Sequence, residues 1–256
     1  EPIAFALNNI KQQVLTETSL RGFESPLAQT LEASRMSRKT LDALLEAIRE
    51  YLPQFRAYLK HKASLLGHEN GLPFYDLFAP IGESSRRFTI EESKEFLLEN
   101  FKGFSEDLAQ MTKEAYENNY IDFLPRKGKV GGAFCSNLPF IKQSRILTNF
   151  SSSLSDVVTI AHELGHAYHF MSTGKHQSIL NNECSLYFVE APSTCNEVIV
   201  SNYLLKTSTD ARFKRWVISN MISRTYFHNM VTHYLEAVYQ DRIYKMIDNN
   251  EMLNAD

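Results

Sequence analysis

Apolar residues that recur every three or four positions constrain the fold of this chain more than any other feature. The segment after Ser37 places leucines and an isoleucine on one face of a predicted helix, and residues 3–17 and 211–247 have the same periodicity. Thr89 and Ser105, each followed by acidic residues, are typical of helix starts. Only 10 glycines and 8 prolines occur among 256 residues, which favours long helices over a turn-rich β protein. We therefore expect a mostly α-helical fold.

One stretch breaks this helical pattern. After Pro125, two glycines precede Ala133-Phe134-Cys135, and residues 145–150 follow a short polar segment, which predicts a small β-hairpin. Ser153, with Asp156 three residues later, then marks the start of a helix predicted over about 154–171. Another helical segment is expected over about 190–205. The small β-ribbon should lie beside the helix that follows it.

Charge and composition exclude several classes of function. The chain has 27 Lys and Arg against 30 Asp and Glu, a net charge of -3, which gives no reason to expect nucleic acid or an anionic membrane as a partner. No apolar run approaches the roughly 20 residues that span a bilayer. The three cysteines lack metal-ligand spacing and suit free thiols in a reduced compartment, so we expect a cytoplasmic protein.

The segment His162-Glu163-Leu164-Gly165-His166 predicts a catalytic metal site. Residues four apart share a helix face, so both imidazoles can bind one ion. Glu163, adjacent to the first ligand, can take a proton from a metal-bound water. Zinc suits this role because it accepts nitrogen ligands and lowers the pKa of bound water to about 7. The composition produces this pattern by chance with a probability of only about 2%, and here it also lies in an amphipathic segment.

A catalytic zinc needs a third protein ligand, and three downstream glutamates are candidates. Glu183, Glu190 and Glu197 lie seven residues apart, so spacing alone does not choose between them. Bulky apolar neighbours are expected to bury Glu190, and Pro192 is best tolerated in a first helical turn, which places Glu190 near a helix start. Glu183 has the context of a solvent-facing loop or cap. Glu197 suits either the orientation of a ligand histidine or a solvated helix position.

Residues 131–197 resemble the catalytic core of the thimet oligopeptidase and oligoendopeptidase F family of zinc metallopeptidases. Residues 77–80, after Tyr75-Asp76, are also similar to a tract found upstream in the oligoendopeptidase F branch. The strong match covers about a quarter of the chain and comprises Gly132-Ala133-Phe134, Ile146-Leu147-Thr148-Asn149, Thr159-Ile160-Ala161-His162-Glu163-Leu164-Gly165-His166-Ala167-Tyr168-His169 and Phe188-Val189-Glu190-Ala191-Pro192-Ser193-Thr194.

This resemblance implies a zinc-dependent endopeptidase with a multi-helix catalytic domain and a channel that admits short unfolded peptides. It implies one Zn2+ per chain held by His162, His166 and Glu190, with Glu163 as the general base. Glu163 would accept a proton from zinc-bound water and later deliver one to the leaving amine. The resemblance also implies that residues 133–136 pair with a substrate backbone as an added strand.

The sequence departs from the family pattern downstream of the zinc motif. The family places oxyanion-stabilising His and Tyr residues on a Gly-rich loop, whereas the corresponding residues here lie on a predicted regular helix. Family members are also roughly twice as long, and the chain opens with Glu1-Pro2, so we expect a catalytic-core piece of a longer polypeptide whose oxyanion-stabilising residues lie elsewhere. Residues 1–125 should form a helical part and residues 126–256 the zinc-binding core, within one contiguous domain.

Two alternatives compete with the endopeptidase. An α-helical zinc carboxypeptidase would need a basic residue for the substrate carboxylate, and Arg145 is available. The second alternative is a binding or scaffold module whose metal site is structural or lost. Such a site has no need of the general base that Glu163 supplies. Two His and one carboxylate also suit cobalt, manganese or iron.

Overall fold

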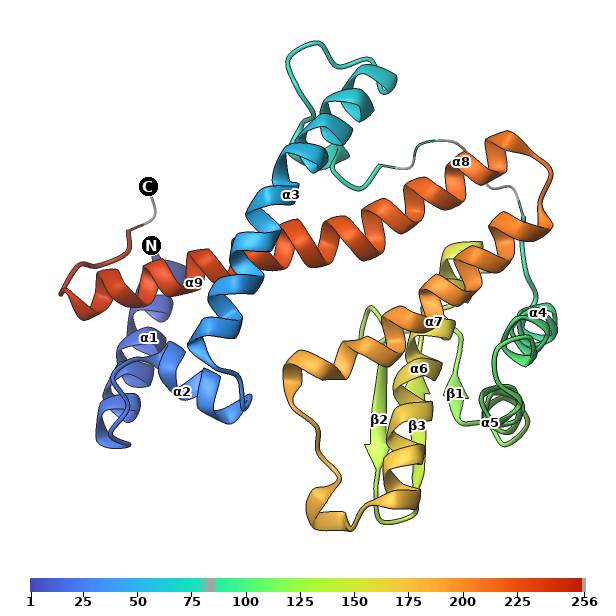
Figure 1. The fold of residues 1–256 in the computed structure, drawn as a ribbon, viewed down its shortest axis with the longest axis horizontal. Coiled ribbons are helices and arrows are strands. Elements are labelled where there is room, and N and C mark those ends of the chain that lie inside the picture. The colour runs from blue at the N-terminus through green and yellow to red at the C-terminus, as the bar shows by residue number, and fades with distance from the viewer. Residues whose placement is uncertain (80, 82–85, 255–256) are drawn as a thin grey trace. The chain divides into compact units, whose positions relative to one another are not determined.

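The computed structural model describes residues 1–79, 81 and 86–254, and it is mostly helical with one small sheet (Figure 1). Pro80, the last residue of the tract that resembles the oligoendopeptidase F branch, lies outside the described residues. The chain forms two compact units, of which one comprises Glu1–Phe74 with Tyr226–Asp256 and the other comprises Tyr75–Thr225. The division at residue 125 expected from the sequence stays a prediction.

The first unit is built from helices near both ends of the chain. Ser37 caps its longest helix, as predicted, by accepting a hydrogen bond from the Thr40 amide. The N-terminal helix contacts the last one, and the Asn8 side chain makes two 2.9 Å hydrogen bonds with the backbone of Leu253. The helices are α1 (Pro2–Leu20), α2 (Pro26–Ala33), α3 (Arg38–Leu65) and α9 (His233–Asp248).

The second unit contains the main hydrophobic core. The predicted starts at Thr89 and Ser105 are confirmed as N-caps, each accepting a hydrogen bond from a backbone amide in the first turn. The central helix buries Leu154, Val157 and Ile160 against its neighbours. The helices of this unit are α4 (Ile90–Lys102), α5 (Glu106–Glu117), α6 (Leu154–His176), α7 (Leu186–Thr207) and α8 (Ala211–Asn220), with the 3₁₀ turn η2 (Ile179–Asn181). A further 3₁₀ turn, η1 (Phe74–Asp76), includes the last residue of the first segment of the other unit.

The predicted β-hairpin is confirmed and belongs to a three-stranded sheet. Strand β2 (Phe134–Leu138) pairs antiparallel with β3 (Gln143–Leu147), and β3 also pairs in parallel with β1 (Ile121–Asp122), giving the order β1-β3-β2. Helix α6 contacts both β2 and β3 (Figure 1), so the ribbon lies beside the helix of the zinc motif. The mostly α fold with a small ribbon is therefore confirmed.

The regular helix predicted over residues 211–247 is wrong in its middle. Helix α8 is followed by a π-helix, η3 (Met221–Thr232), before α9 begins. Apolar spacing predicts a helix but does not distinguish hydrogen bonds to the fourth residue from those to the fifth. Among the described residues, no helix is long and apolar enough to span a membrane.

Candidate active site

Helix α6 begins at a well-defined cap that fixes the register of the zinc motif. The Ser153 hydroxyl accepts a hydrogen bond from the Asp156 amide, and the Asp156 carboxylate accepts one from the Ser153 amide, which completes the predicted capping box. The same carboxylate accepts hydrogen bonds from the backbone and hydroxyl of Ser151. The helix runs beyond the predicted end, to His176, so the motif lies in its middle.

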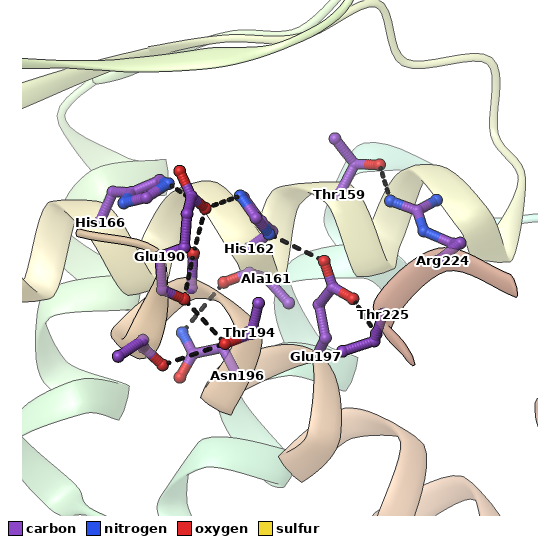
Figure 2. A network of polar contacts seen from close by, with 12 residues as sticks. Thr159, Ala161, His162, His166, Glu190, Thr194, Asn196, Glu197, Arg224 and Thr225 are labelled. Atoms are coloured by element: carbon purple, nitrogen blue, oxygen red, sulfur yellow. Dashed lines mark hydrogen bonds and ion pairs between the residues drawn. The ribbon is translucent and has the colours of Figure 1, made fainter. Parts of the chain in front are cut away.

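His162, His166 and Glu190 converge in the structure (Figure 2). Each offers one ligand atom, and these atoms lie within 4.8 Å of one another. Glu190 Oε2 is 3.2 Å from His162 Nε2 and 3.3 Å from His166 Nε2. Three of the four predicted site residues therefore bring their ligand atoms close together between α6 and α7.

The distances from Glu190 to the two imidazoles fit a zinc ion. Nitrogen and oxygen ligands at about 2.0–2.1 Å from a tetrahedral zinc lie about 3.3 Å apart, which matches the separation of Glu190 from each imidazole. Burial lowers the pKa of His166, which favours the neutral ring that a metal requires. The donor types and these two distances thus suit the ion that the motif predicts.

Gly165 permits the close contact of α6 with α7 that brings Glu190 to the imidazoles. A Cβ atom at this position would lie 2.5 Å from the Pro192 carbonyl oxygen and 2.6 Å from Ser193 Cα. Both neighbours are backbone atoms, so only glycine fits without displacing a helix. The buried Asn196 amide adds a 2.9 Å hydrogen bond to the Ala161 carbonyl across the same contact (Figure 2).

Two expectations about Glu190 are wrong. Helix α7 begins at Leu186, so Pro192 lies inside the helix rather than in its first turn. The Glu190 side chain is 54% exposed rather than buried, because its apolar neighbours Tyr187 and Phe188 are exposed as well. Ser193 holds the side chain instead, donating 2.8 Å and 2.9 Å hydrogen bonds to the carboxylate and carbonyl oxygens of Glu190.

Glu197 orients His162 from the side opposite Glu190 (Figure 2). Its buried carboxylate lies 2.8 Å from His162 Nδ1, which leaves Nε2 facing Glu190. Burial lowers the pKa of His162, but the hydrogen bond and charge of Glu197 outweigh burial and raise it. The sequence left open whether Glu197 orients a ligand histidine or occupies a solvated helix position, and its burial and its contact with His162 support the first interpretation.

Thr225 and Arg224 are contacts of this site that sequence reasoning missed. The Thr225 hydroxyl donates a 2.6 Å hydrogen bond to the second oxygen of Glu197. Burial raises the pKa of Glu197, but the bonds from His162 and Thr225 and the charge of Arg224 outweigh burial and lower it. These residues lie in η3, far along the chain from the motif, and no spacing rule links them to it.

Glu163, the predicted general base, is buried, and burial raises the pKa of its carboxyl to about 7. The charges of Glu190 and Glu197 contribute to this rise, while His162 opposes it. Within the described part of the chain, Glu163 makes no ion pair. The group is therefore poised to exchange a proton near neutral pH.

Other residues singled out in the sequence lie elsewhere. Glu183 is exposed in the loop before α7, as predicted. Arg145 lies 4.2 Å over the Tyr120 ring and donates hydrogen bonds to the Ser144 carbonyl and the Gln143 side chain. The three cysteines are free thiols.

The chain is similar in sequence to known peptidases, which agrees with the peptidase-like metal site described above. The chain matches the family model of peptidase family M3 over residues 4–256. It is 27% identical over 204 residues to oligopeptidase PepF of Bacillus subtilis (strain 168), covering 79% of this chain and 30% of that protein. It is 25% identical over 237 residues to the chromosomal oligoendopeptidase F of Lactococcus lactis subsp. cremoris, covering 93% and 39%.

A crystal structure of a protein from Chlamydophila abortus has the same fold, with a TM-score of 0.80 and 21% identity. That alignment covers 98% of this chain and 42% of the crystallised one. The chain thus spans 30% and 39% of the lengths of the two sequence relatives named above. Because the family match extends over residues 4–256, the chain belongs to peptidase family M3.

Proposed function

We propose that this chain carries the metal site and general base of a zinc-dependent endopeptidase that hydrolyses internal bonds of short unfolded peptides. The observation that carries the proposal is the meeting of His162, His166 and Glu190, with ligand atoms within 4.8 Å, beside a buried carboxyl on the same helix. A purely structural site has no use for that carboxyl. The names of the relatives, an oligopeptidase and an oligoendopeptidase, support the same reaction class.

The residues divide the chemistry between them. Zinc, when bound, acts as a Lewis acid and lowers the pKa of a coordinated water to about 7. Glu163 accepts the proton of the attacking water and then delivers a proton to the leaving amine, a role suited to a buried carboxyl beside the ligand position. Glu197 holds His162 Nδ1, so that Nε2 stays directed at the ligand position.

Strand β2 offers a place for an extended peptide. It lies at the edge of the sheet, paired only with β3 among the described strands, and contacts α6. Unpaired backbone groups on such an edge can add a further strand and bind a peptide largely without regard to its sequence. Phe134 and Leu138 are exposed on this strand and supply apolar contacts for substrate side chains.

The test begins with metal content, measured by elemental analysis after gel filtration of the 256-residue chain and of its Glu190→Gln and Glu163→Gln variants. We expect about one zinc per unchanged chain, much weaker binding in Glu190→Gln, and full binding in Glu163→Gln. Negligible zinc in the folded, unchanged chain would overturn the proposal.

Incubation with peptides of mixed length then separates the reaction classes by mass spectrometry. Internal cuts support the endopeptidase, and Glu163→Gln should slow them by about 10²–10⁴-fold. Ladders of C-terminal trimming would indicate the carboxypeptidase, and zinc binding without cleavage would indicate a scaffold. The engagement of Arg145 with Tyr120 disfavours the carboxypeptidase. Cytoplasmic location and the exclusion of nucleic acid and membrane as partners stay predictions.

A further inference from the structure

The carboxylate of Glu197 is held at both of its oxygens by residues from two different elements. Oε1 is 2.8 Å from His162 Nδ1 on α6, and Oε2 accepts a 2.6 Å hydrogen bond from the Thr225 hydroxyl on η3. The Glu197 residue is only 7% exposed, so water has little access to replace either partner. The two hydrogen bonds together define the plane of the carboxylate.

The plane of the carboxylate needs such hydrogen bonds, because χ3 of a glutamate side chain otherwise adopts a wide range of angles. A carboxylate free to rotate about this bond would offer the imidazole a variable acceptor, and the His162 ring would lose its fixed tautomer and orientation. With Oε2 held by Thr225, Oε1 stays directed at Nδ1, and Nε2 stays directed at Glu190, 3.2 Å away. Thr225 thus acts on the ligand histidine through Glu197.

The adjacent residue anchors the turn that carries Thr225. Arg224 donates a 3.0 Å hydrogen bond to the Thr159 hydroxyl on α6 (Figure 2). It also donates a 3.3 Å hydrogen bond to the Ser155 carbonyl on the same helix. A π-helix has more residues per turn than an α-helix, so neighbouring side chains point in more similar directions. Both side chains thus reach the packed pair of α6 and α7, Arg224 on α6 and Thr225 on α7. The first part of η3 therefore connects the two helices that supply the ligand atoms.

We propose that Thr225 is a positioning residue of the metal site, which fixes the Glu197 carboxylate so that His162 presents Nε2 to the metal, with Arg224 anchoring the π-helical turn. This inference rests on the proposed function, because it assigns a role toward the zinc ligands. It assigns that role to a hydroxyl separated from the metal position by two residues, Glu197 and His162.

The test compares Thr225→Val, which removes the hydroxyl at nearly constant volume, with Thr225→Ser, which keeps it. Thr112→Val serves as the matched control, since Thr112 is buried in the same unit and its hydroxyl has no hydrogen-bond partner in the described residues. Thr225→Ala, which adds no atoms to the site, replaces Thr225→Val if valine is not accommodated. Circular dichroism establishes that each variant is folded.

Zinc alone is the probe of affinity, measured by competition with a chelating dye. We expect Thr225→Val to weaken zinc binding by about 10–100-fold, as for other residues that orient metal ligands, and Thr225→Ser to stay within about threefold of the unchanged chain. Thr112→Val should leave zinc affinity unchanged. Equal zinc affinity in folded Thr225→Val and the unchanged chain would overturn the inference.

A second measurement uses the metal-free chain and does not depend on zinc or activity. Nitrogen-15 NMR of the His162 ring, at a pH where the ring is neutral, should show the Nδ1–H tautomer in the unchanged chain and a smaller share of it in Thr225→Val. An unaltered tautomer ratio would contradict the role of Thr225. If the unchanged chain binds no zinc, the proposed function fails, and the tautomer comparison still decides the role of Thr225.

Discussion

Replacing Gly165 by alanine tests the contact that sets α7 against α6. The new Cβ would lie 2.5 Å from the Pro192 carbonyl oxygen, 2.8 Å from the Pro192 carbonyl carbon and 2.6 Å from Ser193 Cα, whereas ordinary contact begins at 3.4 Å. All three atoms belong to the backbone of α7, so no side-chain rotation relieves the overlap. The helices must separate by about 0.9 Å at this point.

The energetic cost follows from two opposing effects. Overpacking a close contact costs about 1–3 kcal/mol, and the upper end applies because backbone atoms are involved. Alanine is favoured over glycine in a helix by about 1 kcal/mol. We therefore expect a net loss of about 2 kcal/mol in the free energy of unfolding of the metal-free chain, measured by urea denaturation.

The same displacement should disrupt metal binding. Glu190 lies two residues before Pro192, and metal sites tolerate errors of only about 0.2 Å in ligand position. A shift of about 0.9 Å should therefore weaken zinc binding at least about tenfold, measured by competition with a chelating dye. Gly174→Ala, on the same helix, is the control, because its Cβ would meet Lys142 Cβ at an ordinary 3.6 Å. If Gly165→Ala matched Gly174→Ala in stability and zinc affinity, the steric reasoning would be refuted.

Three further predictions concern protons, thiols and the hydroxyl that holds Glu190. The folded-state pKa of Glu163 is raised from 4.5 to about 7, so the metal-free chain should lose about 1–3 kcal/mol of unfolding free energy as the pH rises through this window. Urea titrations at pH 5 and pH 8 measure this loss, and Glu163→Gln should remove it. Burial raises the pKa of Cys135 to about 12, so at pH 8 iodoacetamide should modify exposed Cys195 at least about tenfold faster than Cys135. Peptide mass spectrometry measures both rates, and equal rates would contradict the prediction. Ser193→Ala should weaken zinc binding about tenfold by freeing the Glu190 carboxylate, and an unchanged dissociation constant would show that the 2.8 Å hydrogen bond is dispensable.

The helices were predictable where local chemistry defines them. Thr89, Ser105 and Ser153 each cap a helix through their own side chains, and such signals are contained within four residues of sequence. The metal motif is local in the same sense, since four residues separate His162 from His166 on one helix. Helix α2 was missed although Ser25 followed by Pro26 is a start signal, because none of its eight residues is buried and its apolar pattern is short.

The rest depends on contacts between distant segments. Strand β1 has only two residues and exists because β3 pairs with it. Pro192 lies inside α7 although a proline in a helix interior removes a backbone hydrogen bond, so the close contact of α7 with α6 outweighs the local rule. No pattern in the sequence brings Thr225 to Glu197, because the bond depends on how η3 packs.

The edge of β2 that pairs with no other described strand has a consequence for how the chain behaves at high concentration. The backbone groups that would pair with a peptide are equally able to pair with the same strand of another copy, and Phe134 and Phe140 are exposed beside them. Self-association through this edge would be antiparallel and would block the place of the substrate. A short peptide bound at this edge would then keep the protein dispersed, so the peptide would also protect the protein against aggregation.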